Sequence, residues 1–508
     1  MQIFQRQEIQ ALEQAGEKAG ISLSAMMEQA GQALAWEAEK RLGNLQGRPI
    51  ALLCGAGNNG GDGFVCARAL AEKGAVCTVL LVQGEPKAPL SRSAFLEMPE
   101  AVSCLCAEHQ PRESELALAT ACCVIDCVFG FGFRGDLEGD AARFLALANT
   151  HDCLRLAADL PSGVECDTGR ASRNTFQAHV TVAFTGKKPA HCSYPGKAFC
   201  GETMTASVGI PPALTDRAET AFFQPDSGFF QEALPSVSAQ ANKGDLGRLL
   251  LVCGSYGMTG ACIMAARGAL RCGVGLLHIA IDARAYPILA LAVPEAVFTV
   301  LDFSVPGWEG KLEAALESCS ACAIGSGLGE SAGLLCPPVF SHFAQGGKPL
   351  LLDADALNFC ARHPGALKKI AAPLVVTPHP GEMARLLGTS IPQVQVDRLT
   401  AALGFAQETG AVTVLKGAAT VTAEKGGRAA INPTGNWGMA KGGSGDVLAG
   451  SIGAFLAQGI PPFQSAVLGV YLHGLAGDLC AERFTPRAML PTDLPDMLPE
   501  AWKVLFPL

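Results

Sequence analysis

The chain has 508 residues, of which 49% are hydrophobic, 17% are charged and 58 are glycine. This length suggests two or three domains, and the composition is typical of a well-buried, loop-rich α/β enzyme and excludes a largely disordered protein. The net charge of -9 at pH 7 excludes a protein that binds nucleic acid through a broad basic surface. Anionic ligands must therefore be held locally, by backbone amides, single lysines or metal ions.

The sequence contains neither an evident membrane span nor a secretory leader. No apolar run reaches the roughly 18 residues of a span, and the first residues lack the apolar region of a signal peptide. The 20 cysteines lie mostly in apolar segments, as reduced core thiols do, and the single CxxC at Cys319–Cys322 lacks the partners of a zinc site. We expect a cytoplasmic protein that binds neither membranes nor nucleic acid.

Hydrophobic periodicity predicts helices over residues 5–19 and 24–41 and then a buried strand at 49–54. A glycine-rich turn follows at 55–63 and leads into a helix predicted over 64–73. The turn contains a GxGxxG pattern, which is typical of dinucleotide-binding folds. The match is weak, because the second strand of such a fold ends in an acidic residue and the second strand predicted here ends at Gln83.

Polar side chains occupy this turn and the ends of two later predicted strands. Asn58, Asn59 and Asp62 in the turn are equally suited to a cation or polar-substrate site and to local Asx turns. The later strands end at Asp126 and Asp159. Because the carboxyl ends of parallel strands meet at one edge of a sheet, we expect four oxygen-bearing side chains to converge there. They are Asn59, Asp126, Asp159 and Ser162.

Four motifs together resemble the NAD(P)H-hydrate epimerase domain over nearly all of residues 1–210. The motifs are Gly55–Gly63, the strand through Asp126 with the loop Gly130–Asp136, Asp159–Gly163 and Phe184–Pro189. The resemblance implies that the hydrated nicotinamide nucleotide is bound by Asn58, Asn59, Gly60, Gly61, Asp62, Gly130, Phe131, Gly132, Phe133, Arg134, Gly135, Asp136 and Asp159. It also implies a potassium ion held by Asn59, Asp126 and Ser162, whose oxygen atoms suit a hard cation.

Epimerisation at the hydroxyl-bearing carbon next to the ring nitrogen requires a group that takes and returns protons. Asp159 is the predicted proton shuttle, because partial burial raises the pKa of a carboxyl group. Lys187 is predicted to support it electrostatically.

Residues 211–242 are rich in Pro, Ser and Gln and lose hydrophobic periodicity, as a linker does. The predicted domains are therefore 1–212 and 237–508, joined by a linker at 213–236. Short apolar strands alternate with helices again after the linker, which predicts a mostly parallel sheet with helices on both faces.

Asn432–Asp446 is the most glycine-rich stretch of the second half, and an apolar pattern at helical spacing follows it directly. Such a stretch exposes the backbone amides at a helix start and predicts an anion site. A carboxylate beside bound phosphate would be repelled unless it acted there, so Asp446 is a candidate catalytic base. The alternative is an ordinary N-cap, which the density of glycine and Asn disfavours.

No GxxxxGK[ST] pattern occurs, which excludes a P-loop kinase. A glycine-rich strand end with a terminal Gly-Ser-Gly-Asp instead resembles the ribokinase-like fold, and residues 239–490 resemble the ADP-dependent NAD(P)H-hydrate dehydratase domain. The motifs that carry this resemblance are Gly325–Gly329, Asp353–Asn358 and Thr377–Glu382. It implies that the S-hydrate is bound by Ala265, Gly327, His379 and Asp446, and the adenine nucleotide by Lys416, Gly417, Ala418, Ala419, Thr420 and Gly445.

The two resemblances predict a bifunctional repair enzyme, with a Rossmann-like first domain and a ribokinase-like second domain. The first would interconvert the R and S hydrates of NADH and NADPH, and the second would dehydrate the S form with ADP and Mg²⁺. Nothing in Lys416–Thr420 itself distinguishes ADP from ATP. The alternatives are a small-molecule kinase of the ribokinase-like class fused to a nucleotide-binding domain, and a nucleotide-sensing module without activity. We also expect a homo-oligomer.

Overall fold

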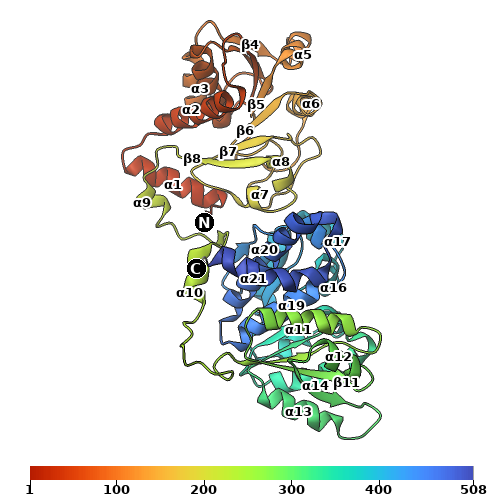
Figure 1. Ribbon diagram of the computed structural model, residues 1–508. Coiled ribbons are helices and arrows are strands. Elements are labelled where there is room, and N and C mark those ends of the chain that lie inside the picture. Colours follow the sequence, from red (N-terminus) through yellow and green to blue (C-terminus); the bar gives the residue numbers. More distant parts are fainter. Residues whose placement is uncertain (507–508) are drawn as a thin grey trace. The chain divides into compact units, whose positions relative to one another are not determined.

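The computed structural model describes residues 1–506 (Figure 1). The chain divides into two compact units, residues 2–222 and residues 223 onward, with Met1 counted in the second. The division falls inside the segment predicted to be the linker. Helix α10 (Ser227–Ala233) belongs to the second unit, because the side chain of Phe230 is fully buried in that unit's core. The predicted domain limits of 212 and 237 themselves stay a prediction.

The first unit is built on a seven-stranded sheet in which all neighbouring strands are parallel. Its order is β4 (Ser103–Cys106), β3 (Val76–Leu81), β2 (Pro49–Cys54), β5 (Cys123–Cys127), β6 (Leu154–Ala158), β7 (Val180–Phe184) and β8 (Glu202–Ala206). The helices are α1 (Arg6–Lys18), α2 (Leu23–Leu42), α3 (Asn58–Glu72), α4 (Pro89–Leu96), α5 (Pro111–Thr120), α6 (Gly139–Ala148), α7 (Pro189–Cys192), α8 (Lys197–Cys200) and α9 (Pro212–Thr215).

Successive side chains of the central strand β2 pack into two separate hydrophobic cores, one on each face of the sheet, because side chains alternate across a strand. Leu52 packs with Phe64 of α3 in one core, whereas Leu53 packs with Phe144 of α6 in the other. The sheet therefore carries helices on both faces, as α3 and α6 in Figure 1 illustrate. This confirms the predicted class of the first domain.

Helix α3 begins at Asn58 and not at Phe64, so the predicted start of this helix was wrong. The glycines after Asn58 lie within the first helical turns, where they allow close packing. A Cβ atom on Gly60 would lie 2.0 Å from the carbonyl oxygen of Gly55, and one on Gly61 would lie 2.5 Å from Met27. The close approach of the helix to its neighbours explains these glycines better than a long flexible turn does.

The second unit has a sheet that is parallel from β12 to β16 and antiparallel at its last two pairings. The order is β12 (Val297–Leu301), β11 (Leu276–Asp282), β10 (Arg248–Val252), β13 (Ala321–Ile324), β14 (Leu350–Leu352), β15 (Leu374–Val376), β16 (Val412–Leu415), β17 (Val421–Ala423) and β18 (Ala429–Ile431). Two-residue strands lie at Gln2–Ile3 (β1) and Phe222–Phe223 (β9).

The further helices of this unit follow the alternating order that the sequence predicts. They are α11 (Thr259–Arg271), α12 (Tyr286–Ala292), α13 (Trp308–Ser318), α14 (Ala332–Phe343), α15 (Ala354–Arg362), α16 (Pro380–Leu387), α17 (Ile391–Val396), α18 (Arg398–Thr409), α19 (Ser444–Ala457), α20 (Pro462–Ala488) and α21 (Leu494–Leu505). Short 3₁₀ turns lie at Gly329–Ser331, Leu367–Lys369, Trp437–Met439 and Pro491–Asp493.

Helices α11 and α19 approach each other through small residues. A Cβ atom on Gly450 would lie 1.8 Å from the carbonyl oxygen of Ala265, and one on Gly268 would lie 2.5 Å from that of Val447. Any larger residue at these two glycines would push the helices apart. This contact sets the position of α19 and hence of Asp446 in its first turn.

Within residues 1–506, none of the helices is long and apolar enough to cross a membrane. The same residues contain no group of three or more His, Cys, Asp or Glu side chains that could hold a metal ion. The cysteines are free thiols, and Cys319 and Cys322 of the CxxC are both buried.

Candidate active sites

A cavity of about 700 Å³ lies in the first unit, beyond the carboxyl ends of its parallel strands. Its lining includes most of the residues that the resemblance implies for the hydrated nucleotide. They are Asn58, Asn59, Asp62, Gly130, Phe131, Gly132, Phe133, Arg134, Asp136 and Asp159. Three others do not line it: Gly60 and Gly61 are packed inside α3, and the amide of Gly135 donates to Glu165 Oε1 over 3.1 Å.

The lysine in contact with Asp159 is Lys188 and not Lys187. Lys188 Nζ donates to Asp159 Oδ1, and the two side chains are 1% and 4% exposed. Lys188 precedes α7 in extended backbone, and it lines the cavity, whereas Lys187 is not among the lining residues. The predicted electrostatic support by Lys187 stays a prediction, and the structure adds Lys188 as the lysine that contacts Asp159 directly.

Asp159 itself is held in an unusual backbone conformation with φ of 60°, in the left-handed region. Its Oδ1 also accepts from the amide of Phe184 over 3.1 Å, whereas its buried Oδ2 has no partner in the described part of the chain. His191 Nδ1 accepts from the amide of Lys188, so the other ring nitrogen donates to the carbonyl oxygen of Asp159 over 2.7 Å. Burial, followed by the charge of Lys188, lowers the pKa of His191 to about 4, which keeps the ring neutral.

Two further carboxyl groups line the same cavity. Burial, followed by the charge of Asp159, raises the pKa of Glu13, and the same two causes raise that of Asp62 well above its ordinary value. Burial thus favours the protonated forms of Glu13 and Asp62, whereas Asp159 is paired with Lys188. Such a cluster is suited to moving a proton to and from a bound ligand.

The three residues implied for potassium gather around residues 128–130. Asp126 Oδ1 accepts from Ser162 Oγ at 2.6 Å and from the amide of Val128 at 3.1 Å, and its Oδ2 accepts from the amide of Ser162 at 2.7 Å. Asn59 lies beside Gly130, because a Cβ atom on that glycine would be 2.9 Å from Asn59 Oδ1.

Asp126 is fully buried, and no Lys, Arg or His in residues 1–506 forms an ion pair with it. Burial raises its pKa to about 6 in spite of three hydrogen bonds. The buried Asn59 Nδ2 also lacks a partner within the described residues. A buried carboxylate without a positive partner fits a monovalent cation, and the oxygen of the neighbouring Asn59 amide would be its other ligand.

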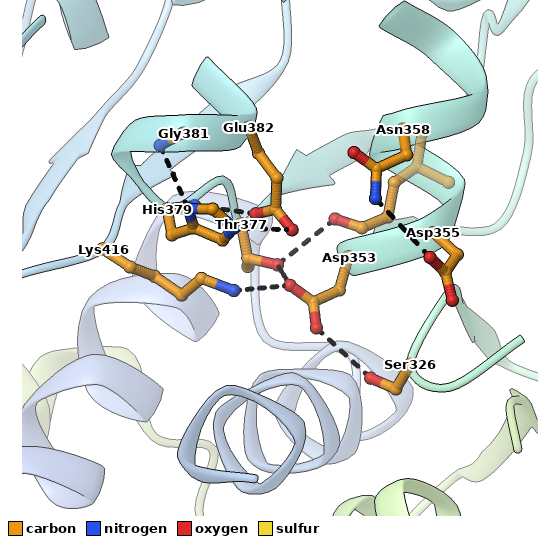
Figure 2. A network of polar contacts seen from close by, with 10 residues as sticks. Ser326, Asp353, Asp355, Asn358, Thr377, His379, Gly381, Glu382 and Lys416 are labelled. Atoms are coloured by element: carbon orange, nitrogen blue, oxygen red, sulfur yellow. Dashed lines mark hydrogen bonds and ion pairs between the residues drawn. The ribbon is translucent and has the colours of Figure 1, made fainter. Parts of the chain in front are cut away.

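In the second unit the polar site is centred on Asp353, which follows β14 and is only 2% exposed. Figure 2 shows its carboxylate between three side chains. Asp353 Oδ1 lies 2.7 Å from Lys416 Nζ and accepts from Thr377 Oγ1 at 2.7 Å, and Oδ2 accepts from Ser326 Oγ at 3.2 Å. The three partners follow three other strands of the sheet, so this network ties the strand ends together.

Asp446 lies in the first turn of α19, after Gly443, whose φ of 112° suits glycine. Burial, followed by the charge of Asp353, raises the pKa of Asp446 to about 6. Lys416 reaches the same helix start, since a Cβ atom on Gly445 would lie 3.2 Å from its Nζ. The N-terminus of α19 therefore lies close to the ammonium group of Lys416 and to the carboxyl group of Asp446, whose pKa is raised.

Helix α16 begins at Pro380, and His379 caps its N-terminus. His379 Nδ1 accepts from the amide of Gly381 over 3.0 Å, and Glu382 Oε2 accepts from the amide of His379 over 2.8 Å (Figure 2). His379 is therefore the N-cap of this helix. Its side chain is nevertheless 51% exposed, which leaves the ring free to contact a ligand as well.

The loop Lys416–Thr420 has two residues in the left-handed region, Gly417 at φ of 141° and Ala419 at 52°. Beneath it lies Arg398, which is 2% exposed and donates to the carbonyl oxygens of Leu415 and Lys416 over 3.0 and 3.2 Å. A Cβ atom on Gly417 would lie 2.9 Å from this guanidinium. Arg398 therefore supports the loop from below.

Gly327 and Ala265, two of the residues implied to contact the S-hydrate, differ in how open they are to a ligand. Gly327 has φ of 64°, and its carbonyl oxygen accepts from Ser255 Oγ over 3.0 Å. Ala265 is 1% exposed and lies against α19, so its side chain has no open surface toward a ligand.

Both units match families of known proteins. Residues 23–190 match the family described as YjeF-related protein N-terminus, and residues 249–500 match NAD(P)H-hydrate dehydratase. A bifunctional NAD(P)H-hydrate repair enzyme of Moorella thermoacetica is 38% identical, over 93% of this chain and 91% of that protein. The equivalent enzyme of Escherichia coli is 34% identical, over 95% and 90%. The chain belongs to the bifunctional NAD(P)H-hydrate repair enzymes.

Solved structures similar to this repair-enzyme chain cover its second unit. A ribokinase-like superfamily protein of Enterococcus faecalis is 28% identical with a TM-score of 0.50, over 57% of this chain and 98% of that one. This confirms the ribokinase-like fold. An ADP/ATP-dependent NAD(P)H-hydrate dehydratase of Bacillus subtilis is 33% identical with a TM-score of 0.49, over 55% and 97%.

Sequence reasoning missed four residues of these two sites: Glu13, Lys188, His191 and Arg398. Lys188 belongs to the motif Phe184–Pro189 that the resemblance already used, and His191 follows this motif by two residues, so the sequence indicated this region. Glu13 lies on an ordinary amphipathic helix, and Arg398 starts one, so neither carried a local signal.

Proposed function

We propose that this repair enzyme interconverts the R and S hydrates of NADH and NADPH in its first unit. In the second unit it dehydrates the S form to the reduced cofactor with an adenine nucleotide as phosphoryl donor. The observation that carries the proposal is the start of α19, where Asp446 and Lys416 meet at an anion-binding helix end. The family relationship supports the same pair of activities.

Dehydration begins with the hydroxyl group of the hydrate, which is a poor leaving group. Asp446, with a pKa near 6, is ionised at neutral pH and accepts the hydroxyl proton while the oxygen attacks the terminal phosphorus of the nucleotide. The amides at the helix start and Lys416 stabilise the transferring group. The ring nitrogen then expels phosphate, and loss of a proton from the adjacent carbon restores the dihydropyridine.

The nucleotide lies on Lys416–Thr420 in this proposal, with the hydrate near Gly327, His379 and Asp446. ADP is the proposed donor, and the residues of the loop are equally suited to ATP. Mg²⁺ would enter with the nucleotide in this proposal and would neutralise phosphate charge.

Epimerisation is proposed for the cavity of the first unit. Asp159 exchanges protons with the hydrate, Lys188 holds its Oδ1 in place, and the unpartnered Oδ2 is the atom available for the exchange. Potassium would be held by Asn59, Asp126 and Ser162, where it would compensate the buried charge of Asp126 and anchor residues 128–130.

The test supplies mixed hydrate epimers with ADP or with ATP and follows absorbance in the reduced-nicotinamide band. Full recovery with ADP supports both activities, recovery of one epimer's share contradicts the epimerase, and recovery with ATP alone contradicts the donor. The Asp446→Asn variant should lose dehydration and keep epimerisation. A small-molecule kinase would instead accumulate a phosphorylated product with no recovery of absorbance.

We further propose a cytoplasmic location, because free thiols on this scale are typical of a reducing compartment. The homo-oligomer stays a prediction, which light scattering of the purified chain checks.

A further inference from the structure

A second hollow, of about 1430 Å³, lies in the second unit between the ends of α15 and α16 and the turn at Gly329. We call it the α15–α16 cleft. Its lining includes Asp355, Phe359, Arg362, His363 and Arg385. Clefts of roughly 300–1,000 Å³ already hold drug-sized ligands, so this hollow has room for half of a dinucleotide.

The α15–α16 cleft borders the phosphoryl-transfer site. Asp355 follows Asp353 by two residues, and its Oδ2 accepts from the amide of Gly329 over 2.8 Å. In Figure 2 Asp355 lies on the side of Asp353 that faces away from Lys416. Arg385 lies on α16 and follows the cap residue His379 by six residues, roughly 9 Å along the helix axis at 1.5 Å per residue. A ligand whose reactive ring lies at Asp446 therefore extends into this cleft when it extends away from Lys416.

The α15–α16 cleft carries two arginines beside the carboxyl groups of Glu330 and Asp355, whereas carboxylates outnumber lysines at the reaction site. Arg362 and Arg385 are exposed, and within residues 1–506 neither forms an ion pair. The carboxylates of Asp353, Glu382 and Asp446 crowd the reaction site, where Lys416 is already paired. The two arginines are thus the cations that remain available for an anionic ligand on this side.

The wall of the cleft beside Arg362 is flat and aromatic. The rings of His363 and Phe359 stack with their centroids 4.1 Å apart and an angle of 25° between their planes. His363 is exposed, and such a surface suits the face of a purine ring.

We propose that the α15–α16 cleft binds the adenosine end of hydrated NADPH, and that Arg362 and Arg385 bind its 2′-phosphate. This assignment rests on the proposed dehydratase function. A phosphate monoester carries between one and two negative charges at pH 7, and guanidinium groups bind it through paired charge-assisted hydrogen bonds. Hydrated NADH lacks this phosphate, so the two arginines make the site prefer the NADPH form.

The experiment measures dehydration of the S-hydrates of NADPH and NADH by the full chain and by the variants Arg362→Gln, Arg385→Gln and the double variant. Arg483→Gln, at an exposed arginine of α20, is the matched control. In the double variant KM for hydrated NADPH should rise roughly tenfold or more. KM for hydrated NADH, KM for the nucleotide and kcat should change by less than about threefold.

An equal rise of KM for both hydrates, or a rise of KM for ADP alone, would overturn the assignment, and so would an unchanged preference. Recovery of neither reduced cofactor by the unmodified chain would contradict the proposed function instead. Binding of adenosine 2′,5′-bisphosphate, measured by calorimetry, tests the cleft independently of activity. The double variant should bind it more weakly than the unmodified chain; since both carry the same first unit, equal affinity would overturn the proposal.

Discussion

The ammonium group of Lys188 donates a hydrogen bond to Asp159, and both side chains are almost completely buried. A buried charge that loses its partner is costly, typically by about 3–5 kcal/mol. Because Lys188 contacts Asp159 and Lys187 does not line the cavity, we expect the two neighbouring lysines to have different roles, and the difference is measurable.

We expect Lys188→Met to abolish epimerisation and to lower the unfolding free energy of the first unit by about 3 kcal/mol. Lys187→Met is the matched control and should retain both properties. Denaturant unfolding and the rate of R-to-S interconversion give the two readings. If Lys187→Met impaired interconversion more than Lys188→Met did, the original assignment to Lys187 would stand.

The buried carboxylate of Asp126 predicts a stabilising effect of potassium. A cation that binds only the folded chain raises the midpoint of thermal unfolding, and the rise grows with its concentration. We expect K⁺ to raise Tm relative to Li⁺ at equal ionic strength, and Asp126→Asn to abolish the difference. Asp496→Asn, at an exposed carboxylate, is the control. Equal midpoints in the two salts for the unmodified chain would contradict a potassium site.

The raised pKa of Asp446 predicts how dehydration depends on pH. The base is ionised above its pKa of about 6, so kcat should fall about tenfold per pH unit below pH 6. The measurement is kcat for the S-hydrate at saturating nucleotide between pH 5 and pH 8. A rate that stayed constant down to pH 5 would exclude Asp446 as the general base.

The same pKa has a consequence for stability. It lies above the ordinary value of 3.8, so the folded chain binds this proton more tightly than the unfolded chain does. Asp446 therefore lowers stability above pH 6, and the loss fades as the pH falls from 6 to 4. Asp446→Asn should raise the unfolding free energy by about 2 kcal/mol at pH 8 and by much less at pH 4. An equal change at both values would assign the effect to packing.

The contacts of the buried Arg398 with the loop Lys416–Thr420 predict that this residue affects nucleotide affinity. Arg398→Met should leave the carbonyl oxygens of Leu415 and Lys416 unsatisfied, at about 1–3 kcal/mol each, and loosen the loop above them. KM for the nucleotide should rise about tenfold, with KM for the hydrate unchanged. Arg398→Lys should restore part of the affinity. A loss of stability with unchanged KM would limit Arg398 to a structural role.

The amino-acid sequence by itself determined the fold class, the alternation of strands and helices, and the positions of the functional motifs. Short apolar strands followed by glycine-rich turns specify parallel sheets, and in such sheets the residues after the strands meet at one edge. For this reason Asp126 and Asp159 could be predicted to share one site without a structure, whereas the central position of Asp353 in the second site became evident only from its contacts. Asp446 could be assigned as well, because the glycines that expose a helix start precede it directly.

Only the tertiary structure decided which side chains meet those motifs. The start of α3 depends on the close packing of Gly60 and Gly61, which no local pattern distinguishes from a flexible turn. Whether Lys187 or Lys188 contacts Asp159 depends on how the segment before α7 packs. Arg398, like Glu13, reaches its site from a distant part of the chain, and contacts between distant segments leave no periodic signal in the sequence.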